Sequence, residues 1–515
     1  MRRLIFAVVL GLGLGIASVP AARALDPDTL RQDLTEALKG GIFAYANQAF
    51  SFTEVRTTAQ GEAVRVEILA LALPLPDLGG RLELGDLAFT VADAGADTGA
   101  EAGARRYRVS EVTAAGEATL VDDAGKDAVL INYRLERLAG VWSAGLRYFL
   151  DLDMAIAGFE IVMPEENLAL GIAEVTAVSR STTRADGLTD MVSEARAVGL
   201  RMINPDFGTL QIAELYVDYE SQGQDLVGFR AFTEALRTLN DGDTPPDRSA
   251  LAAIVEELAK IDILPQGFIE RFRLTDLTYL DPAQKPRFHL DQAEVDIVAG
   301  ELHLPLGYGN LGMKVAGLRA ETPGGAPGAE AADPRQALVP ENLGFIVSVE
   351  RFPMRLMWRS VMRAIALSVA SGDRGSPNDA IGEAMGAEIL AAINEARTIL
   401  RLDRLDVEAP AGRVIGEGVL QADVSVPIGV TGRLDLTITG LDRMISIATG
   451  ATAAEGGGEV PGGNGSVMIL MMLKSMARRE TAPDGTAIDR FEIALTPAGE
   501  VLVNGQPLGA MAPPQ

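Results

Sequence analysis

Residues suited to acid–base or metal chemistry are few in this chain. It has no cysteine and only two histidines, His289 and His303. Each histidine stands between apolar residues in an expected strand, so alternation turns both imidazoles toward solvent. No further ligands follow at metal-binding spacing, and the chain has no Gly-x-Ser-x-Gly elbow. We therefore expect structural histidines, no metal and no cofactor.

Other motifs that could carry chemistry are weak. The glycine-rich stretch 456–465 lacks the lysine and the preceding strand of a phosphate loop. The cluster Asp241, Asp243 and Asp247 lacks the glutamate and the spacing of a calcium loop, which favours an acidic turn. Carboxylates are abundant, but no pair stands out as general acid and base. The sequence predicts that the protein is not an enzyme.

The most distinctive resource of the chain is apolar surface. A methionine-dense helix is expected over 466–478, and a second apolar helix over 356–369. Methionine fills gaps in cores and also suits adaptable binding surfaces, so either helix can be core packing or a lid over a ligand. By strand or helix phase, the candidate ligand-binding residues are Leu274, Leu290, Val315, Leu436, Ile438, Leu470 and Leu473.

A six-residue pattern recurs in the segments that must position these side chains: apolar, any, apolar, any, acid or glycine, apolar. Its first two apolar residues keep the two-residue period of a strand, whereas the third follows three residues later. A strand that skips one residue without turning over its buried face needs a bulge or a tight corner. The repeats lie at 82–87, 107–112, 170–175, 210–215, 272–277, 313–318 and 436–441.

The repeats predict a mostly β protein with helical insertions, built on a long, curved antiparallel sheet of bulged strands. An N-terminal β region is expected over 25–321, with a helical insertion at about 226–260. A Pro/Gly/Ala-rich linker follows at 322–334. The C-terminal β region, 335–515, carries helices at about 355–400 and 466–478. Segments 93–104 and 448–465 are expected to be loops.

Segments 159–175 and 200–215 resemble each other. Both lead from an apolar strand through a proline to an Ile-Ala-Glu motif. Internal duplication would leave such a pair, and shared strand patterning is the alternative.

The first 24 residues have the layout of a secretory signal peptide. Arg2 and Arg3 precede an apolar stretch over 4–19, and a small-x-small cleavage site ends at Ala24. We expect export to a bacterial periplasm, with cleavage after Ala24 and no stable transmembrane anchor after cleavage. An uncleaved anchor is the alternative.

The charge of the chain limits its partners. With 71 acidic and 45 basic residues, the formal net charge is −26. A field of this sign repels phosphate backbones and anionic head groups, which excludes nucleic-acid binding. A solvated acidic surface also serves solubility without any partner.

The C-terminal run from Ile488 to Gly505, with its Asn-Gly ending, resembles the C-terminal signature of an alphaproteobacterial family catalogued as domain of unknown function 2125. Stretches 106–112 and 400–410 are similar to it as well. The family has no assigned activity, so no functional residue is carried over. The recurring pattern of bulged strands also resembles that of envelope proteins of the AsmA and YdgA kind. Some AsmA-type proteins are thought to hold acyl chains in long sheet grooves. Fold resemblance alone does not settle function.

Two hypotheses follow. The first is a non-enzymatic periplasmic protein that binds or carries a hydrophobic envelope molecule such as a phospholipid, because apolar strand faces and apolar helices could form a groove. The second is an envelope scaffold that binds partner proteins, with the same apolar faces fully buried. An enzyme ranks below both.

Overall fold

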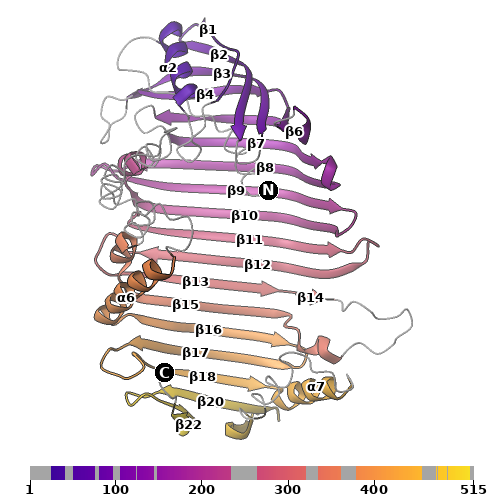
Figure 1. Cartoon of the computed structure of the whole chain (residues 1–515), viewed down its shortest axis with the longest axis vertical. Helices are drawn as coiled ribbons and strands as arrows, with labels where there is room; N and C mark the ends of the chain where they lie inside the picture. The colour runs from indigo at the N-terminus through magenta and orange to yellow at the C-terminus, as the bar shows by residue number, and fades with distance from the viewer. Residues whose placement is uncertain are drawn as a thin grey trace. The chain divides into compact units, whose positions relative to one another are not determined.

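The computed structural model describes the chain from residue 25 to residue 510, with gaps. The described residues are 25–40, 50–75, 80–96, 105–122, 125–143, 148–232, 264–320, 334–360, 378–454, 471, 474–483 and 485–510. The expected leader (1–24), linker residues 322–333 and most of the insertion at 226–260 lie outside these ranges. The described part is mostly β with a long antiparallel sheet, which confirms the expected fold class (Figure 1).

The chain forms two compact units. Unit 1 comprises residues 1–269 and 361–381, and unit 2 comprises 270–360 and 382–515. The predicted division at 322–334 stays a prediction, because nearly all of that segment lies outside the described residues. Only Pro334 is described, and it begins a 3-10 turn, Pro334–Leu338.

Unit 1 begins with helix α2 (Pro27–Gly40), in which leucines recur every four residues. Leu30, Leu34 and Leu38 of this helix are buried in a core that the strands supply with further aliphatic and aromatic side chains. The strands are β1 (Glu54–Gln60), β2 (Ala63–Leu75), β3 (Gly80–Ala96), β4 (Arg105–Ala114), β5 (Glu117–Asp122), β6 (Asp127–Ser143), β7 (Tyr148–Met163), β8 (Leu168–Thr183), β9 (Thr189–Asn204) and β10 (Gly208–Gln224).

The similar segments 159–175 and 200–215 become two antiparallel hairpins, β7 with β8 and β9 with β10. Each hairpin has a glycine with positive φ on its first strand, Gly158 or Gly199. The layout is therefore shared, as the sequence similarity predicted, while the duplication itself stays a prediction.

Unit 2 is also built of antiparallel strands (Figure 1). Strand β11 (Gly267–Leu280) begins at the unit boundary. The remaining strands are β12 (Pro286–Gly300), β13 (Gly307–Ala316), β14 (Arg319–Ala320), β15 (Asn342–Phe352), β16 (Ile399–Ala409), β17 (Gly412–Ala422), β18 (Val430–Thr439), β19 (Arg478–Thr481), β20 (Ala487–Leu495), β21 (Glu500–Val503) and β22 (Gln506–Ala510). Helix α7 (Leu441–Ala454) packs with the end of the sheet around a small core that includes Ile438 and Phe491.

The skip that the six-residue pattern predicted is confirmed in five of the seven repeats. Backbone φ is positive at the fifth position of four repeats, at Glu111, Asp276, Gly317 and Gly440. In the repeat at 82–87 the positive φ falls one residue earlier, at Gly85. The apolar residues on both sides of that skip, Leu82, Leu84 and Leu87, are all buried. At 170–175 and 210–215 the positive φ lies instead on the paired strand, at Gly158 and Gly199. Strand pairing shifts register at the repeats 82–87 and 107–112, whereas Gly317 and Gly440 come directly after the ends of β13 and β18.

Several predicted helix and loop boundaries were wrong. Residues 354–360 are helical, but α6 (Asn378–Ala396) ends before Leu400, which lies in β16. Arg397 has a positive φ, and the Thr398 amide donates to the carbonyl of Ile393, which closes the helix.

The loop predicted at 448–465 is helical as far as Ala454, the end of α7, and the loop predicted at 93–104 begins as part of β3. Of the helix predicted at 466–478, the described residues 471 and 474–476 are helical. The helix ends before Arg478, which begins β19. Among the described residues, no helix is both long and apolar enough to cross a membrane.

Candidate functional site

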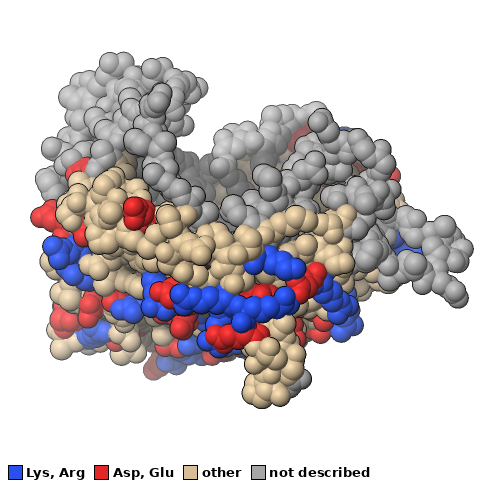
Figure 2. All heavy atoms as spheres, turned by 90° about the horizontal axis from the view of Figure 1, so that it is seen from below, with Lys and Arg blue, Asp and Glu red and all other residues tan. Residues whose placement is uncertain are grey.

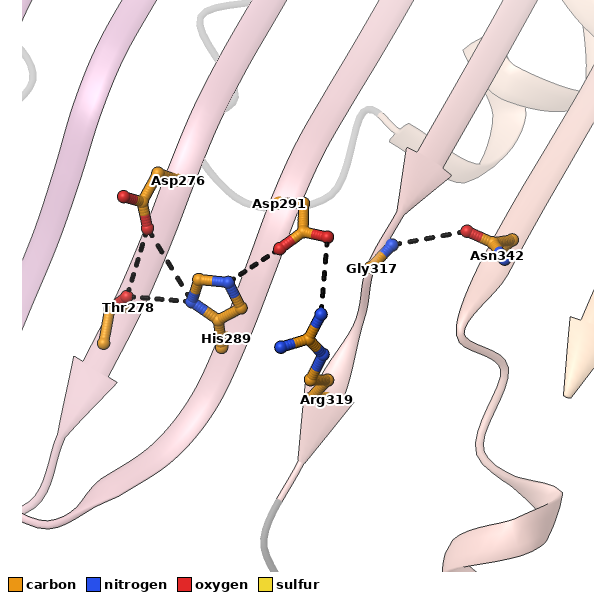
Figure 3. Close-up of polar contacts among 7 residues, drawn as sticks. All are labelled: Asp276, Thr278, His289, Asp291, Gly317, Arg319 and Asn342. Carbon is orange, nitrogen blue, oxygen red and sulfur yellow. Dashed lines mark hydrogen bonds and ion pairs between the residues drawn. The ribbon is translucent and has the colours of Figure 1, made fainter. Parts of the chain in front are cut away.

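The polar cluster around His289 is the arrangement closest to a catalytic relay in unit 2. Thr278 on β11 lies 3.0 Å from His289 Nδ1, and Asp291 Oδ1 lies 2.8 Å from His289 Nε2 on β12 (Figure 3). Asp276 Oδ1 is 3.7 Å from the same Nδ1. Threonine, histidine and aspartate thus form a hydrogen-bonded chain across two strands.

This chain of polar groups lies on an open sheet surface rather than in a pocket. The His289 side chain is 30% exposed, and both aspartates are more than half exposed. An effective nucleophile needs donors placed in a site from which water is excluded. The structural role predicted for His289 therefore remains the better interpretation. His303 is exposed as expected, but it lies in the turn between β12 and β13 rather than in a strand.

The cluster instead holds neighbouring skips together. Gly317, the fifth residue of its repeat, approaches Asp291 so closely that an added Cβ would lie 1.9 Å from Asp291 Oδ2. Its amide donates to Asn342 Oδ1 on β15 at 3.3 Å (Figure 3). Arg319 follows on β14 and faces Asp291 at 3.7 Å. The skips of β11 and of the β13–β14 connection are therefore linked through His289 and Asp291.

Acids at the same position of other repeats play a similar part. Asp86 Oδ1 accepts a hydrogen bond from the amide of Ala70, whose φ is positive, at 2.8 Å. Glu111 accepts from the Thr90 hydroxyl at 2.7 Å. Glu214 pairs with Arg196 on the neighbouring strand at 2.9 Å. Sequence analysis found the position but missed this role, which the recurring acid could have indicated.

One side of the unit 2 sheet carries four rows of apolar residues, and this side is called here the apolar face. Each row consists of directly paired residues across β12, β13, β15, β16, β17, β18 and β20, which therefore share one side of the sheet. Row 1 is Ala293, Val315, Leu343, Val407, Val414, Ile438 and Asp489. Row 2 is Val295, Met313, Phe345, Leu405, Gly416, Leu436 and Phe491. Row 3 is Ile297, Leu311, Val347, Leu402, Gly418, Leu434 and Ile493. Row 4 is Ala299, Gly309, Val349, Leu400, Leu420, Gly432 and Leu495.

Coverage of the apolar face differs between its rows. At the β18–β20 end, rows 1 and 2 pack with Leu441 and Ile445 of α7, and Ile438 is only 7% exposed. The single acid of the rows, Asp489, is buried with Arg479 Nε 4.0 Å away. In row 4, by contrast, the directly paired Leu400 and Leu420 are 43% and 39% exposed. The apolar face is therefore open toward row 4.

The opposite side of the same strands carries charge. Glu294 pairs with Arg273 at 3.1 Å, and Asp435 pairs with Arg433 at 2.8 Å. Both acids stand between apolar-face residues in sequence, so alternation turns them to the other side. Figure 2 shows basic and acidic side chains interspersed in this way along one side of the molecule. Such mixing favours solubility over the binding of one charged partner.

The strongest ion pair on the charged side is centred on Asp406 of β16. Arg413 donates to both carboxylate oxygens, at 2.7 and 2.8 Å, and Arg404 donates at 2.9 Å. These hydrogen bonds, first those of Arg413, lower the pKa of Asp406 to about 2. The carboxylate is a structural link between β16 and β17.

Three of the described candidate ligand-binding residues belong to the apolar face of unit 2. Val315 and Ile438 belong to row 1, and Leu436 belongs to row 2. Leu290 is buried on β12, three residues before Ala293, the first member of row 1. Arg273 forms an ion pair with Glu294 on the charged side. Alternation therefore turns the neighbouring Leu274 to the apolar side. Leu470 and Leu473 lie outside the described residues.

Two exposed members of the face, Leu400 and Leu420, could not be singled out from the sequence. Leu400 falls at the end of the helix predicted at about 355–400, and Leu420 is not among the candidate ligand-binding residues. The pairing of Leu400 with Leu420 depends on a register shift in β16 between residues 402 and 405, which no local sequence pattern indicates.

No group of acidic or histidine side chains that could hold a metal ion occurs in the described part of the chain. Comparisons with protein families, with curated proteins and with experimental structures give no match to this chain. The functional argument therefore rests on the apolar face itself, and the family resemblance stays a prediction.

Proposed function

We propose that this protein is a non-enzymatic carrier or binding protein of the periplasm, and that the apolar face of unit 2 holds the acyl chain of a hydrophobic envelope molecule such as a phospholipid. The observation that carries the proposal is the set of four apolar rows, of which row 4 is exposed to solvent at Leu400 and Leu420. The uncovered part of this apolar face favours a nonpolar occupant, since each buried methylene contributes about 0.8 kcal/mol.

The dimensions of the rows suit one acyl chain. Seven strands have six spacings of about 4.8 Å, which give each row a length of about 29 Å. The hydrocarbon core of a bilayer, about 30 Å thick, holds two acyl chains end to end. One row therefore exceeds the length of a single chain, and neighbouring rows leave room for a second.

The polar chemistry of the face supports binding without catalysis. Twenty-seven of its row positions are apolar or glycine, and the remaining one, Asp489, is buried beside Arg479. A chain held there would meet no nucleophile from the rows. The His289 cluster lies beyond the rows, on the part of β12 before Ala293, where His289 and Asp291 alternate with the buried Leu290.

Native mass spectrometry tests the proposal directly. The mature protein is purified from a periplasm without detergent, and solvent-extracted lipids are identified. The expected result is a stoichiometric lipid adduct. A clean ligand-free mass would contradict the proposal, and a stable complex with another protein in its place would support the scaffold hypothesis.

A further inference from the structure

A compact group of neutral polar side chains lies on β8, β9 and β10 of unit 1, and is called here the hydroxyl block. It occupies three consecutive rows of directly paired residues on one side of the sheet. The rows are Ser179, Ser193 and Tyr219, then Ser181, Met191 and Ser221, then Thr183, Thr189 and Gln224. Eight of these nine side chains carry a hydroxyl or an amide, and none carries a charge.

Part of the block has unmet hydrogen-bonding capacity. The hydroxyls of Ser179 and Ser193 pair with each other at 2.8 Å. The hydroxyls of Ser181 and Ser221 and the side-chain oxygen of Gln224 are buried and have no hydrogen-bond partner among the described residues. Ser221 is only 2% exposed. Leaving a buried polar group unpaired costs about 1–3 kcal/mol, so three on neighbouring rows call for an occupant.

The spacing of these groups limits what the occupant can be. Ser181 and Ser221 flank Met191 on alternate strands, so their backbones stand about 10 Å apart, twice the strand spacing. No single atom reaches both hydroxyls. The side-chain oxygen of Gln224 is an acceptor, so whatever meets it must donate. An occupant with several oxygens, at least one of them a hydroxyl, fits both conditions.

The surroundings make the site amphipathic. The rows next to the hydroxyl block on the same strands are apolar: Ala177, Ala195 and Val217, then Val175, Ala197 and Leu215. The nearest ion pair joins Arg184 and Asp190. Asp190 stands between Thr189 and Met191 in sequence, so alternation turns its carboxylate to the other side of the sheet. We infer that the hydroxyl block of unit 1 binds the uncharged, hydroxyl-bearing head group of an amphiphile, such as a sugar or a polyol. This site does not depend on the acyl-chain site proposed in unit 2.

Calorimetric titration of the whole mature protein with octyl glucoside, below its micelle concentration, tests the inference. Octyl phosphocholine, which has the same tail and a charged head group, is the control ligand. Octyl glucoside is expected to bind more tightly than octyl phosphocholine, and Ser221→Ala is expected to weaken octyl glucoside about tenfold. Thr182→Ala, next to Ser181 but on the exposed side of β8, is expected to leave the affinity unchanged.

Two results would overturn the inference. One is equal affinity for the two ligands, which would assign binding to the alkyl tail. The other is an unchanged affinity in Ser221→Ala together with a higher melting temperature, which would show that the hydroxyl is simply unpaired or hydrated. If Ser221→Ala does not fold, Ser181→Ala gives the same comparison from the other side of Met191.

Discussion

At the residue scale, acids and glycines occupy the positions where strands skip one residue, and their contacts stabilise those positions. Asp276 and Gly317 both have positive φ at the fifth position of their repeats, and both lie in the His289 cluster. A β-carbon at Gly317 would collide with Asp291, whereas Gly61, also at positive φ, has open space around it. The two glycines therefore separate the cost of backbone strain from the cost of crowding.

Gly317→Ala is expected to lower the free energy of unfolding by about 2–3 kcal/mol, because strain and collision with Asp291 add. Gly61→Ala is expected to cost about 1 kcal/mol, from strain alone. Urea denaturation measures both. Asp291→Ala combined with Gly317→Ala should recover part of the larger loss. Equal losses in the two single variants would show that the contact with Asp291 is unimportant.

Asp406 gives a second prediction at this scale, concerning pH. Its pKa in the folded protein is about 2, below the ordinary value of 3.8, so its contribution is complete above pH 4 and is lost as the pH falls through 2. The side chain is only 16% exposed. Asp406→Asn is therefore expected to lower the free energy of unfolding by about 2 kcal/mol at pH 6.

The difference between Asp406→Asn and the wild type is expected to shrink between pH 4 and pH 2. Denaturation curves recorded at several pH values measure this difference. A difference that stays constant down to pH 2 would mean that Arg413 and Arg404 do not stabilise the charged form in the folded protein.

At the element scale, the two sides of β17 have opposite characters. Leu420 belongs to row 4 and Val419 to the charged side, yet they are adjacent in sequence and similarly exposed, at 39% and 36%. Leu420→Glu is expected to abolish the lipid adduct while changing stability by less than about 1 kcal/mol, and Val419→Glu is expected to leave the adduct intact. Native mass spectrometry and thermal melting measure the two effects. Loss of the adduct in both variants, or in neither, would show that row 4 does not hold the ligand.

The pair of variants also separates binding from folding. Ile438→Glu, in the covered part of row 1, is expected to unfold the protein, since it would bury a charge within the core beside α7. If Leu420→Glu unfolds the protein as well, row 4 is core rather than an open binding surface.

The strand pattern made the fold class and the skips predictable, but not the apolar face. Alternation within one segment shows which residues share a side, and the six-residue repeat shows where a strand steps past one residue. The meeting of Val315 with Ile438 in row 1 depends on four successive registers and on long connections between β13 and β16. Register between distant strands is set by turns and bulges, which local sequence specifies weakly. The hydroxyl block could not be predicted from the sequence for the same reason, because its rows depend on the register between β8, β9 and β10.

At the scale of the whole molecule, charge and apolar surface act on different partners. The formal net charge of −26 creates a long-range field that opposes approach to anionic surfaces. The apolar face acts only on contact. A carrier with this combination is expected to take up lipid fastest from membranes that carry no net charge.

This expectation can be tested with fluorescent phospholipid in vesicles of two compositions. Uptake from phosphatidylcholine vesicles should exceed uptake from vesicles that contain phosphatidylglycerol at low ionic strength. The gap should close as salt is added, because the screening length falls from about 30 Å at 0.01 M to about 3 Å at 1 M. The variant Leu420→Glu should take up little lipid from either vesicle, which separates contact with the apolar face from long-range repulsion. Faster uptake from the anionic vesicles at low salt would mean that a local basic surface, rather than the net charge, governs the approach to the membrane.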